Sequence, residues 1–331
     1  MKIANREARI RLLCAMAALC LLVATSLPAL AADTPKLQVG MMQLGDHPSL
    51  KIIEDAIRAG LEEQGLADRV ELKYLNAQFD MSNLPTLANQ LIGEGCTLLV
   101  PITTPCAQAT VAAAADQDVD IIFTAVTDPV EAGLVADLAV TDQRITGVSD
   151  YVPVDKVFEL AERLTPGFQT VGLLYNAGED NSVAGVKAAK AYCEANGLSF
   201  AEAIVSNSSE VAQAAQSLVG KADICFTSND NTVAAAMPAY AQVGLDNKLP
   251  IYVGADTMVA DGGLATVGVD YNVLGRQTAR MIGDYLDGTP IAELPVEVMM
   301  EAAPMVNVDV AGELGIAVPE DVQALHTGDA L

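Results

Sequence analysis

The amino-acid sequence predicts an α/β protein with two doubly wound parallel-sheet lobes joined by a hinge. Short apolar segments alternate with amphipathic helical segments along almost the whole chain, which is typical of parallel sheets covered by helices. This alternation also repeats along the chain. The polar residues that end the apolar segments of the first half have counterparts 126 to 133 residues later. The equivalent pairs are Gln43 and Asn176, Asn76 and Ser206, Thr103 and Asn229, and Thr127 and Asp256.

The first half of the chain contains five expected strands with helices between them. The strands are 37–42, 70–75, 97–102, 121–126 and 145–148. The helices begin at Pro48 and cover 82–91 and 105–115. Leu50, Ile53 and Ile57 recur at helical spacing, which predicts one apolar face on the helix that Pro48 opens. Pro105 suits the first turn of its helix, where the missing N–H costs nothing.

The second half repeats this order. Its expected strands are 170–174, 199–205, 222–226, 251–253 and 264–269. Its expected helices begin at Val154 and cover 182–195, 209–219, 232–243 and 274–286. The segment Ser149–Pro153 is the best candidate for a crossover between the lobes. We therefore expect lobe 1 to comprise 36–149 plus 260–295, and lobe 2 to comprise 150–259 plus 296–331.

The N-terminal 31 residues do not follow this pattern. A basic region is followed by the apolar run Leu12–Val23 and by Ala29-Leu30-Ala31, an A-x-A cleavage site. This arrangement predicts a secretory signal peptide, because the apolar run is shorter than the ~20 residues of a membrane span. The expected location of the mature protein is the bacterial periplasm.

Composition excludes several classes of function. The full chain has a formal charge of −25, so binding to nucleic acid is excluded, because phosphates require a basic surface. Strong acidity favours a soluble monomer. With only His47 and His326 and no Cys/His cluster, we expect no metal and no cofactor. Buried free thiols are favoured for the cysteines, although a bridge between Cys193 and Cys225 stays open.

Hydroxyl groups at two strand ends of the first half predict an anion site. Thr103 and Thr104 lie between a strand and a helix whose first turn has no acidic residue. Free N–H groups at that helix end and the hydroxyls suit a carboxylate, although Thr104 as a simple helix cap is an equal alternative. Thr127 and the backbone after Ala125 add donors from the next strand.

The strand ends of the second half carry acidic residues instead. Asp230 lies between two asparagines, Asp256 ends the next strand, and Glu179 follows Tyr175. An N-cap role would also explain Asp230. Facing an anion site, the acids would recognise a zwitterion, most simply an amino acid, as the lobes close.

Catalysis is disfavoured by the motifs. There is no nucleophile–base pair, no GxGxxG and no phosphate-binding loop beside the carboxylates. His47, which precedes Pro48, is interpreted as a turn or helix-start residue rather than a ligand contact. We therefore expect a binding protein and not an enzyme.

Motifs in order along the chain resemble the ABC-transporter solute-binding proteins of the tryptophan/tyrosine-binding type. They are Asn76-Ala77-Gln78, Thr104-Pro105-x-Ala107-Gln108, the segments 123–129 and 146–150, Tyr175-Asn176-x-Gly178-Glu179-x-Asn181-Ser182, Asp230-Asn231-Thr232 and the segment 268–277. The resemblance implies a type I periplasmic-binding-protein fold with three crossovers, no catalysis, and delivery of solute to an inner-membrane permease.

The resemblance also implies roles for single residues. Thr104 and Thr127 resemble carboxylate contacts, and Asp230 resembles the ammonium contact. Gln43, Asn181, Ser182, Ser149 and Asp256 would line the rest of the site. Thr103, Ala125, Asp150 and Tyr175 complete the set of candidate ligand-binding residues.

Two departures from the family pattern concern the preference for the ligand side chain. Gly45-Asp46 precedes His47-Pro48 where the family often has a hydrophobic residue and Glu, and Phe79 stands where Gly commonly follows Asn-Ala-Gln. The expected function is the solute-binding component of an ABC importer that closes on an aromatic or large apolar amino acid. A receptor for a sensor or chemotaxis protein, and a receptor for sugars or other small solutes, remain alternatives.

Overall fold

The computed structural model describes residues 36–139, 144–299 and 303–328, and the expected signal peptide lies outside them. One sheet has the strand order β11-β5-β4-β3-β1-β2. Its strands are β1 (Leu37–Gln43), β2 (Val70–Asn76), β3 (Leu98–Ile102), β4 (Asp120–Thr124), β5 (Ile145–Ser149) and β11 (Glu297–Val298). All its pairings are parallel. This sheet and the helices on it are called lobe 1.

The second sheet has the order β13-β12-β10-β9-β8-β6-β7. Its strands are β6 (Thr170–Asn176), β7 (Ser199–Val205), β8 (Ile224–Thr227), β9 (Ile251–Val253), β10 (Ala265–Val267), β12 (Pro304–Asn307) and β13 (Gln323–Leu325). This sheet and its helices are called lobe 2. The first five strands along the chain have the same order in both sheets, so the repeat expected from the sequence is a repeat of topology.

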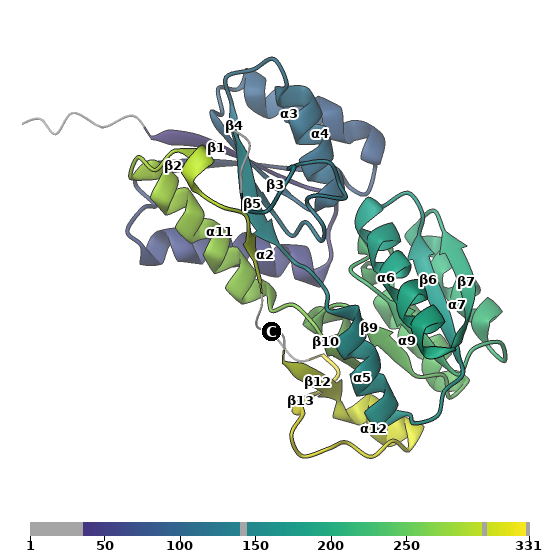
Figure 1. Cartoon of the computed structure of the whole chain (residues 1–331). Helices are drawn as coiled ribbons and strands as arrows, with labels where there is room; N and C mark the ends of the chain where they lie inside the picture. Colours follow the sequence, from purple (N-terminus) through teal and green to yellow (C-terminus); the bar gives the residue numbers. More distant parts are fainter. Residues whose placement is uncertain (1–35, 140–143, 300–302, 329–331) are drawn as a thin grey trace, which may run out of the picture. The chain divides into compact units, whose positions relative to one another are not determined.

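Helices cover both faces of each sheet (Figure 1). They are α2 (Pro48–Glu63), α3 (Leu84–Gly93), α4 (Thr104–Ala114), α5 (Val154–Leu164), α6 (Asp180–Asn196), α7 (Val211–Leu218), α8 (Asn231–Ala234), α9 (Met237–Asp246), α10 (Asp256–Ala260), α11 (Tyr271–Leu286) and α12 (Val308–Leu314), with short 3₁₀ turns at 81–83, 208–210 and 291–293. In lobe 1, α3 and α4 lie on one face, and α2 packs with α11 on the other. The two doubly wound lobes of the sequence-based prediction are confirmed.

Helix α11 shows how a late segment returns to lobe 1. A Cβ atom added at Gly275 would lie 2.5 Å from the Cβ of Ala56 and 2.8 Å from the carbonyl oxygen of Ile53. Only glycine permits this approach, so α11 and α2 pack with their backbones close together. The chain therefore crosses from sheet to sheet between β5 and α5, between β10 and α11, and between β11 and β12, which agrees with the three crossovers that the resemblance implies.

The expected lobe boundaries require two corrections. Residue 260 is too early for the return to lobe 1, because β10 pairs with β9 in the second sheet. Residue 296 is too early for the return to lobe 2, because β11 pairs with β5 in the first sheet. The second sheet is also not wholly parallel, since β10 and β12 are antiparallel. Strand pairing over so few residues depends on tertiary contacts and leaves little trace in local hydrophobicity.

One expected helix is interrupted. The segment 232–243 forms the end of α8 and most of α9, because Pro238 lacks the N–H that a continuous helix would use, and its ring would meet the carbonyl four residues earlier. The cysteines of the described segments, Cys96, Cys106, Cys193 and Cys225, are free and buried. The interpretation as unpaired thiols is thus confirmed. Within the described ranges, every helix is too short or too polar to cross a membrane.

Candidate functional site

A cavity lies where the carboxyl ends of the strands of both lobes meet. Lobe 1 contributes His47, Ser49, Leu50, Thr103, Ala125 and Thr127, and lobe 2 contributes Asn181, Asn229, Asp230, Asn231, Ala234, Ala255 and Met258, while Asp150 and Tyr271 line it beside the crossovers. None of these lining residues is Lys or Arg. The cavity is therefore lined by carboxylates, amides and hydroxyls, with Leu50, Met258 and small alanines as its apolar part.

The N-terminus of α4 lies at the edge of this cavity, which its N-cap residue Thr103 lines. Its N-cap residue Thr103 makes no side-chain capping bond, and the first turn contains no acidic residue. The hydroxyls of Thr103 and Thr104 are buried without a hydrogen-bond partner among the described residues. Unpaired N–H groups, a positive dipole end and two available hydroxyls make this helix end suitable for a carboxylate.

The backbone at this edge is strained. Thr103 has a φ of 96° and Ala125, at the end of the neighbouring strand, has a φ of 54°. Residues with a Cβ rarely adopt these values, and the surrounding structure must hold them there. Both residues line the cavity. Strained residues of this kind are common at binding sites.

Asp150 lies at the first crossover, directly after β5. It accepts hydrogen bonds from the hydroxyl of Thr127 at 2.9 Å, the side-chain amide of Asn229 at 2.8 Å and the hydroxyl of Tyr271 at 3.2 Å. Burial raises its pKa to about 7 in spite of these three donors. Because Asn229 belongs to lobe 2 and Thr127 to lobe 1, Asp150 links the two lobes at the hinge.

Asp230 and Glu179 form a buried acidic pair in lobe 2. Asp230 accepts from the backbone N–H of Asn176 at 2.6 Å and of Val233 at 2.8 Å, and from the hydroxyl of Ser182. Burial and the neighbouring charge of Glu179 raise the pKa of Asp230 to about 7. Lobe 2 thus holds two buried acidic groups, of which Asp230 lines the cavity.

The two lobes are held together by direct hydrogen bonds across the cleft. They join His47 to Asn231 at 3.3 Å, Ser49 to Thr257 at 2.6 Å and Gln108 to Asp180 at 2.7 Å. A salt bridge joins Lys187 to Glu131 at 2.7 Å. These contacts describe a closed arrangement of the lobes, in which a ligand would be enclosed.

Six of the residues that the sequence nominated lie together in the cavity lining. They are Thr103, Ala125, Thr127, Asp150, Asn181 and Asp230. The others lie outside the lining. Thr104 is at the start of α4, Gln43 donates to the carbonyl of Gly45, and Ser149 donates to the carbonyl of Thr127.

Three further nominated residues have partners elsewhere. Ser182 donates to Asp230 behind the cavity, and Tyr175 donates to Glu202 at 2.9 Å. Asp256 is buried beside the cavity and accepts from the N–H of Thr257 at 2.6 Å, and burial raises its pKa to about 7. Ser182 thus contacts Asp230, which lines the cavity, and Asp256 contacts the backbone of Thr257.

Sequence reasoning did not nominate nine of the lining residues. They are His47, Ser49, Leu50, Asn229, Asn231, Ala234, Ala255, Met258 and Tyr271. For Asn229 and Asn231 the signal was present, since both flank Asp230 at a strand end. For Leu50 and Met258 the sequence gives no local indication, because the pattern of an apolar residue on a helix is the same whether the residue faces a sheet or a ligand.

Comparison with known proteins identifies the family. The family model described as ABC transporter substrate binding protein matches residues 38–328. The tyrosine-binding protein of Clostridioides difficile (strain R20291) is 37% identical over 273 residues, which are 82% of this chain and 79% of that protein. The chain belongs to the ABC transporter substrate-binding protein family. As such it is a ligand binder and not an enzyme, and the resemblance seen in its motifs is confirmed.

Two solved structures of related proteins, one with a bound ligand and one ligand-free and open, are similar to this substrate-binding protein. The ABC domain in complex with L-Trp from Streptococcus pneumoniae is 37% identical, with a TM-score of 0.83 over 88% of this chain and 100% of that one. The ligand-free, open structure of a substrate-binding protein with adhesive properties from Clostridium difficile is 34% identical, with a TM-score of 0.67 over 88% and 99%. The type I fold is thus confirmed. The higher score for the Trp complex agrees with the hydrogen bonds that join the lobes here.

Proposed function

We propose that this substrate-binding protein is the solute receptor of an ABC importer and closes on an aromatic amino acid. One observation carries the proposal. On one lobe the cavity borders an uncapped helix N-terminus, where the hydroxyls of Thr103 and Thr104 have no partner among the described residues. On the other lobe it borders buried carboxylates, and its lining contains no Lys or Arg. A ligand that satisfies both sides carries a carboxylate and an ammonium group.

The apolar part of the cavity supports a large side chain on that ligand. Leu50, Ala234, Ala255 and Met258 are buried, and the ring of Tyr271 lies beside them in the lining. The Met258 thioether and the Tyr271 ring make favourable contacts with aromatic groups. The relatives named for tyrosine and solved with L-Trp support the same ligand class.

The proposed location and partner follow from the family and the N-terminal sequence. Import by an ABC transporter implies an inner-membrane permease that receives the closed, monomeric receptor. The basic and apolar segments of residues 1–31 support secretion to the periplasm.

A thermal-shift panel over the twenty amino acids, with arabinose as the sugar control, tests this function. We expect tyrosine, tryptophan and phenylalanine to raise the unfolding midpoint most, because ligand that binds only the folded protein stabilises it by mass action. Stabilisation by arabinose alone, or by no amino acid, would refute the proposal.

The anion side is tested by replacing Thr103, which lines the cavity and whose hydroxyl has no partner among the described residues, with valine. We expect the affinity for tyrosine to fall about tenfold, or ~1.5 kcal/mol, since a hydrogen bond to a charged group is lost. Tyrosine amide, which has no carboxylate, is expected to lose less. Isothermal titration measures both, and Thr97→Val serves as the control because Thr97 is exposed at the opposite end of the β3 segment. Equal losses for acid and amide would contradict the anion site.

The acidic side predicts that binding depends on pH. Asp150 and Asp230 have pKa values of about 7, so part of each is protonated below neutrality and its attraction to an ammonium is lost. We expect the affinity for tyrosine to fall between pH 8 and pH 6, by up to about tenfold per pH unit for each proton displaced.

The stability of the unliganded protein is expected to change in the opposite direction. A carboxyl whose folded pKa lies above its unfolded value contributes stability below the unfolded pKa of about 4, and this contribution is lost as pH rises towards 7. The thermal shift caused by tyrosine should therefore be larger at pH 8 than at pH 6. A shift that is the same at both values would count against the acidic side, and Asp150→Asn should flatten the profile.

A further inference from the structure

His47 occupies a position in the cavity that a turn residue does not need. It ends the segment after β1 as the N-cap of α2, yet its side chain makes no capping bond. The imidazole is 8% exposed and lines the cavity. The ring of Phe79 covers it at a centroid distance of 6.4 Å, with 25° between the planes. Aromatic packing thus holds the ring at the cleft without using its two nitrogens.

Hydrogen bonds from Asn231 to Glu179 determine which nitrogen of His47 carries the proton. The side-chain amide nitrogen of Asn231 donates to Oε2 of Glu179 at 2.6 Å, and its backbone N–H donates to the same oxygen at 3.1 Å. This leaves Oδ1 of Asn231 as an acceptor, and it lies 3.3 Å from Nε2 of His47. The imidazole therefore carries its hydrogen on Nε2 and has a lone pair on Nδ1.

That lone pair is a buried acceptor with no donor. Nδ1 of His47 has no hydrogen-bond partner in the part of the chain that the structure describes. Burial lowers the pKa of His47 to about 4, so the ring stays neutral near neutral pH. A buried acceptor without a partner is costly, and such groups are normally satisfied by a ligand or water.

Asn181 is oriented in the same way from the other lobe. Its side-chain nitrogen donates to the carbonyl of Asn229 at 2.5 Å and to Oε2 of Glu179 at 3.3 Å. Its Oδ1 is buried and has no partner among the described residues, and Asn181 also lines the cavity. Glu179 thus leaves one acceptor available on each lobe.

We propose that Glu179 is a positioning residue that prepares His47 Nδ1 and Asn181 Oδ1 as neutral acceptors for the ammonium group of the ligand. This inference rests on the proposed function and adds the residues that contact the ammonium group. The ammonium has three N–H donors, one for each acceptor and one for a further contact, and Asp230 lines the same cavity as His47 and Asn181. Because His47 belongs to lobe 1 and Asn181 to lobe 2, the ammonium itself joins the lobes and favours closure.

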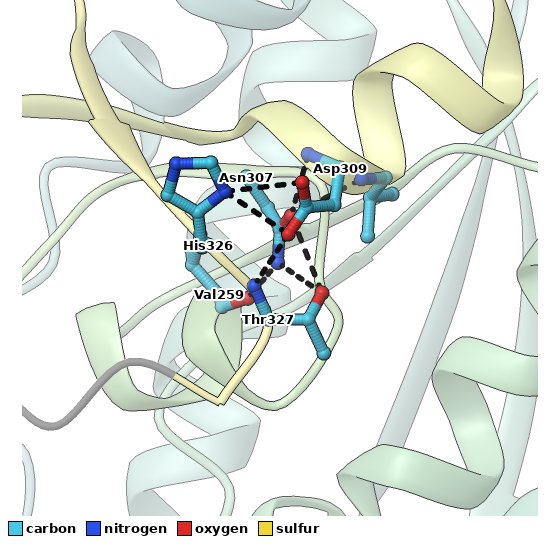
Figure 2. Close-up of polar contacts among 6 residues, drawn as sticks. Val259, Asn307, Asp309, His326 and Thr327 are labelled. Carbon is cyan, nitrogen blue, oxygen red and sulfur yellow. Dashed lines mark hydrogen bonds and ion pairs between the residues drawn. The ribbon is translucent and has the colours of Figure 1, made fainter.

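Nitrogen-15 NMR of the histidine side chains tests the first half of the proposal. The chain has only two histidines, and the second, His326, lies beside Asp309 with Nδ1 at 3.0 Å from its carboxylate, in the C-terminal segment held by Asn307 and Thr327 (Figure 2). The spectrum of His326→Gln therefore assigns the resonances of both histidines. We expect His47 to be protonated on Nε2 alone, and its Nδ1 resonance to move upfield when tyrosine is added. A proton on Nδ1, or an unmoved resonance while tyrosine binds, would overturn the proposal.

Two substitutions of His47 test the second half. In His47→Gln the amide nitrogen reaches the place of Nε2, so the bond to Asn231 can persist while the Nδ1 acceptor is lost. His47→Asn places an acceptor near Nδ1 and loses that bond. We expect His47→Gln to bind tyrosine about tenfold more weakly and His47→Asn to retain more of the affinity, with His326→Gln unchanged.

Analogues of tyrosine identify the group that His47 contacts. For 3-(4-hydroxyphenyl)propionate, which lacks the ammonium, we expect wild type and His47→Gln to bind alike. Equal losses for tyrosine and this analogue, or a loss that disappears with phenylalanine and so follows the phenol, would refute the ammonium contact. If wild type binds no amino acid, the proposed function itself fails and this inference fails with it.

The positioning role of Glu179 has its own readout. In Glu179→Gln the amide of Asn231 is no longer held, so His47 is expected to lose its single tautomer in the same spectra. If that variant does not fold, Asn231→Leu removes the same connection. A His47 tautomer that stays unchanged in the variant that folds would show that Glu179 has only a structural role.

Discussion

Replacing Glu179 with alanine is expected to lower the free energy of unfolding by at least about 3 kcal/mol. The carboxylate is completely buried, and it accepts from the backbone N–H groups of Asn231 at 3.1 Å and Thr232 at 3.0 Å, and from the hydroxyl of Thr232 at 2.7 Å. Each buried donor left without an acceptor costs roughly 1 to 3 kcal/mol. Since several donors lose their partner together, the total exceeds that of a typical single substitution, which is about 1 kcal/mol.

Urea unfolding of the unliganded protein measures this effect. Glu194→Ala is the matched control, because Glu194 lies on the same helix α6 and is exposed. Its effect should stay within about 0.5 kcal/mol. If Glu179→Ala unfolded at the same urea concentration as the control, the carboxylate would not be the centre of this network.

Replacing Asp230 with asparagine is expected to weaken tyrosine binding about thirtyfold, or ~2 kcal/mol. The change removes a buried carboxylate that lines the cavity, in a site where burial strengthens electrostatic interactions. Part of the loss will fall on the protein itself, because the new amide would oppose the N–H of Asn176 or Val233. The comparison with the deaminated analogue separates these two effects.

Titration calorimetry with tyrosine and 3-(4-hydroxyphenyl)propionate gives that comparison. Tyrosine should lose at least tenfold more affinity than the analogue in Asp230→Asn. Asp246→Asn is the control, since Asp246 is an exposed residue of the same lobe and should leave both affinities unchanged. An affinity for tyrosine that does not change in Asp230→Asn would remove Asp230 from the site.

Much of the fold can be predicted from the sequence, because buried parallel strands and amphipathic helices have strong local hydrophobic patterns. Strands β1, β6, β7 and β9 differ from their predicted ranges by no more than two residues at either end. The final third is harder to read, since β11 has two residues and β10 and β12 have three and four. Such short strands pair through tertiary contacts, so the local sequence pattern does not show where the chain changes lobe.

The candidate site shows the same division. Polar residues at strand ends are visible in the sequence, and Thr103, Thr127 and Asp230 do line the cavity. The direction of each side chain is not visible, because it depends on the neighbour that holds it. Tyr175, for example, lies at a strand end but donates to Glu202 on the adjacent strand β7 and lies outside the lining.

The sequence by itself determined the α/β class, the repeated order of strands and the edge of each sheet at which polar groups gather, because these depend on periodicity along the chain. Only the tertiary structure decided which acids reach the cavity, which amides they orient, and that His47 belongs there. Those properties arise from hydrogen bonds between residues as far apart as His47 and Asn231, whose separation of 184 positions leaves no local pattern.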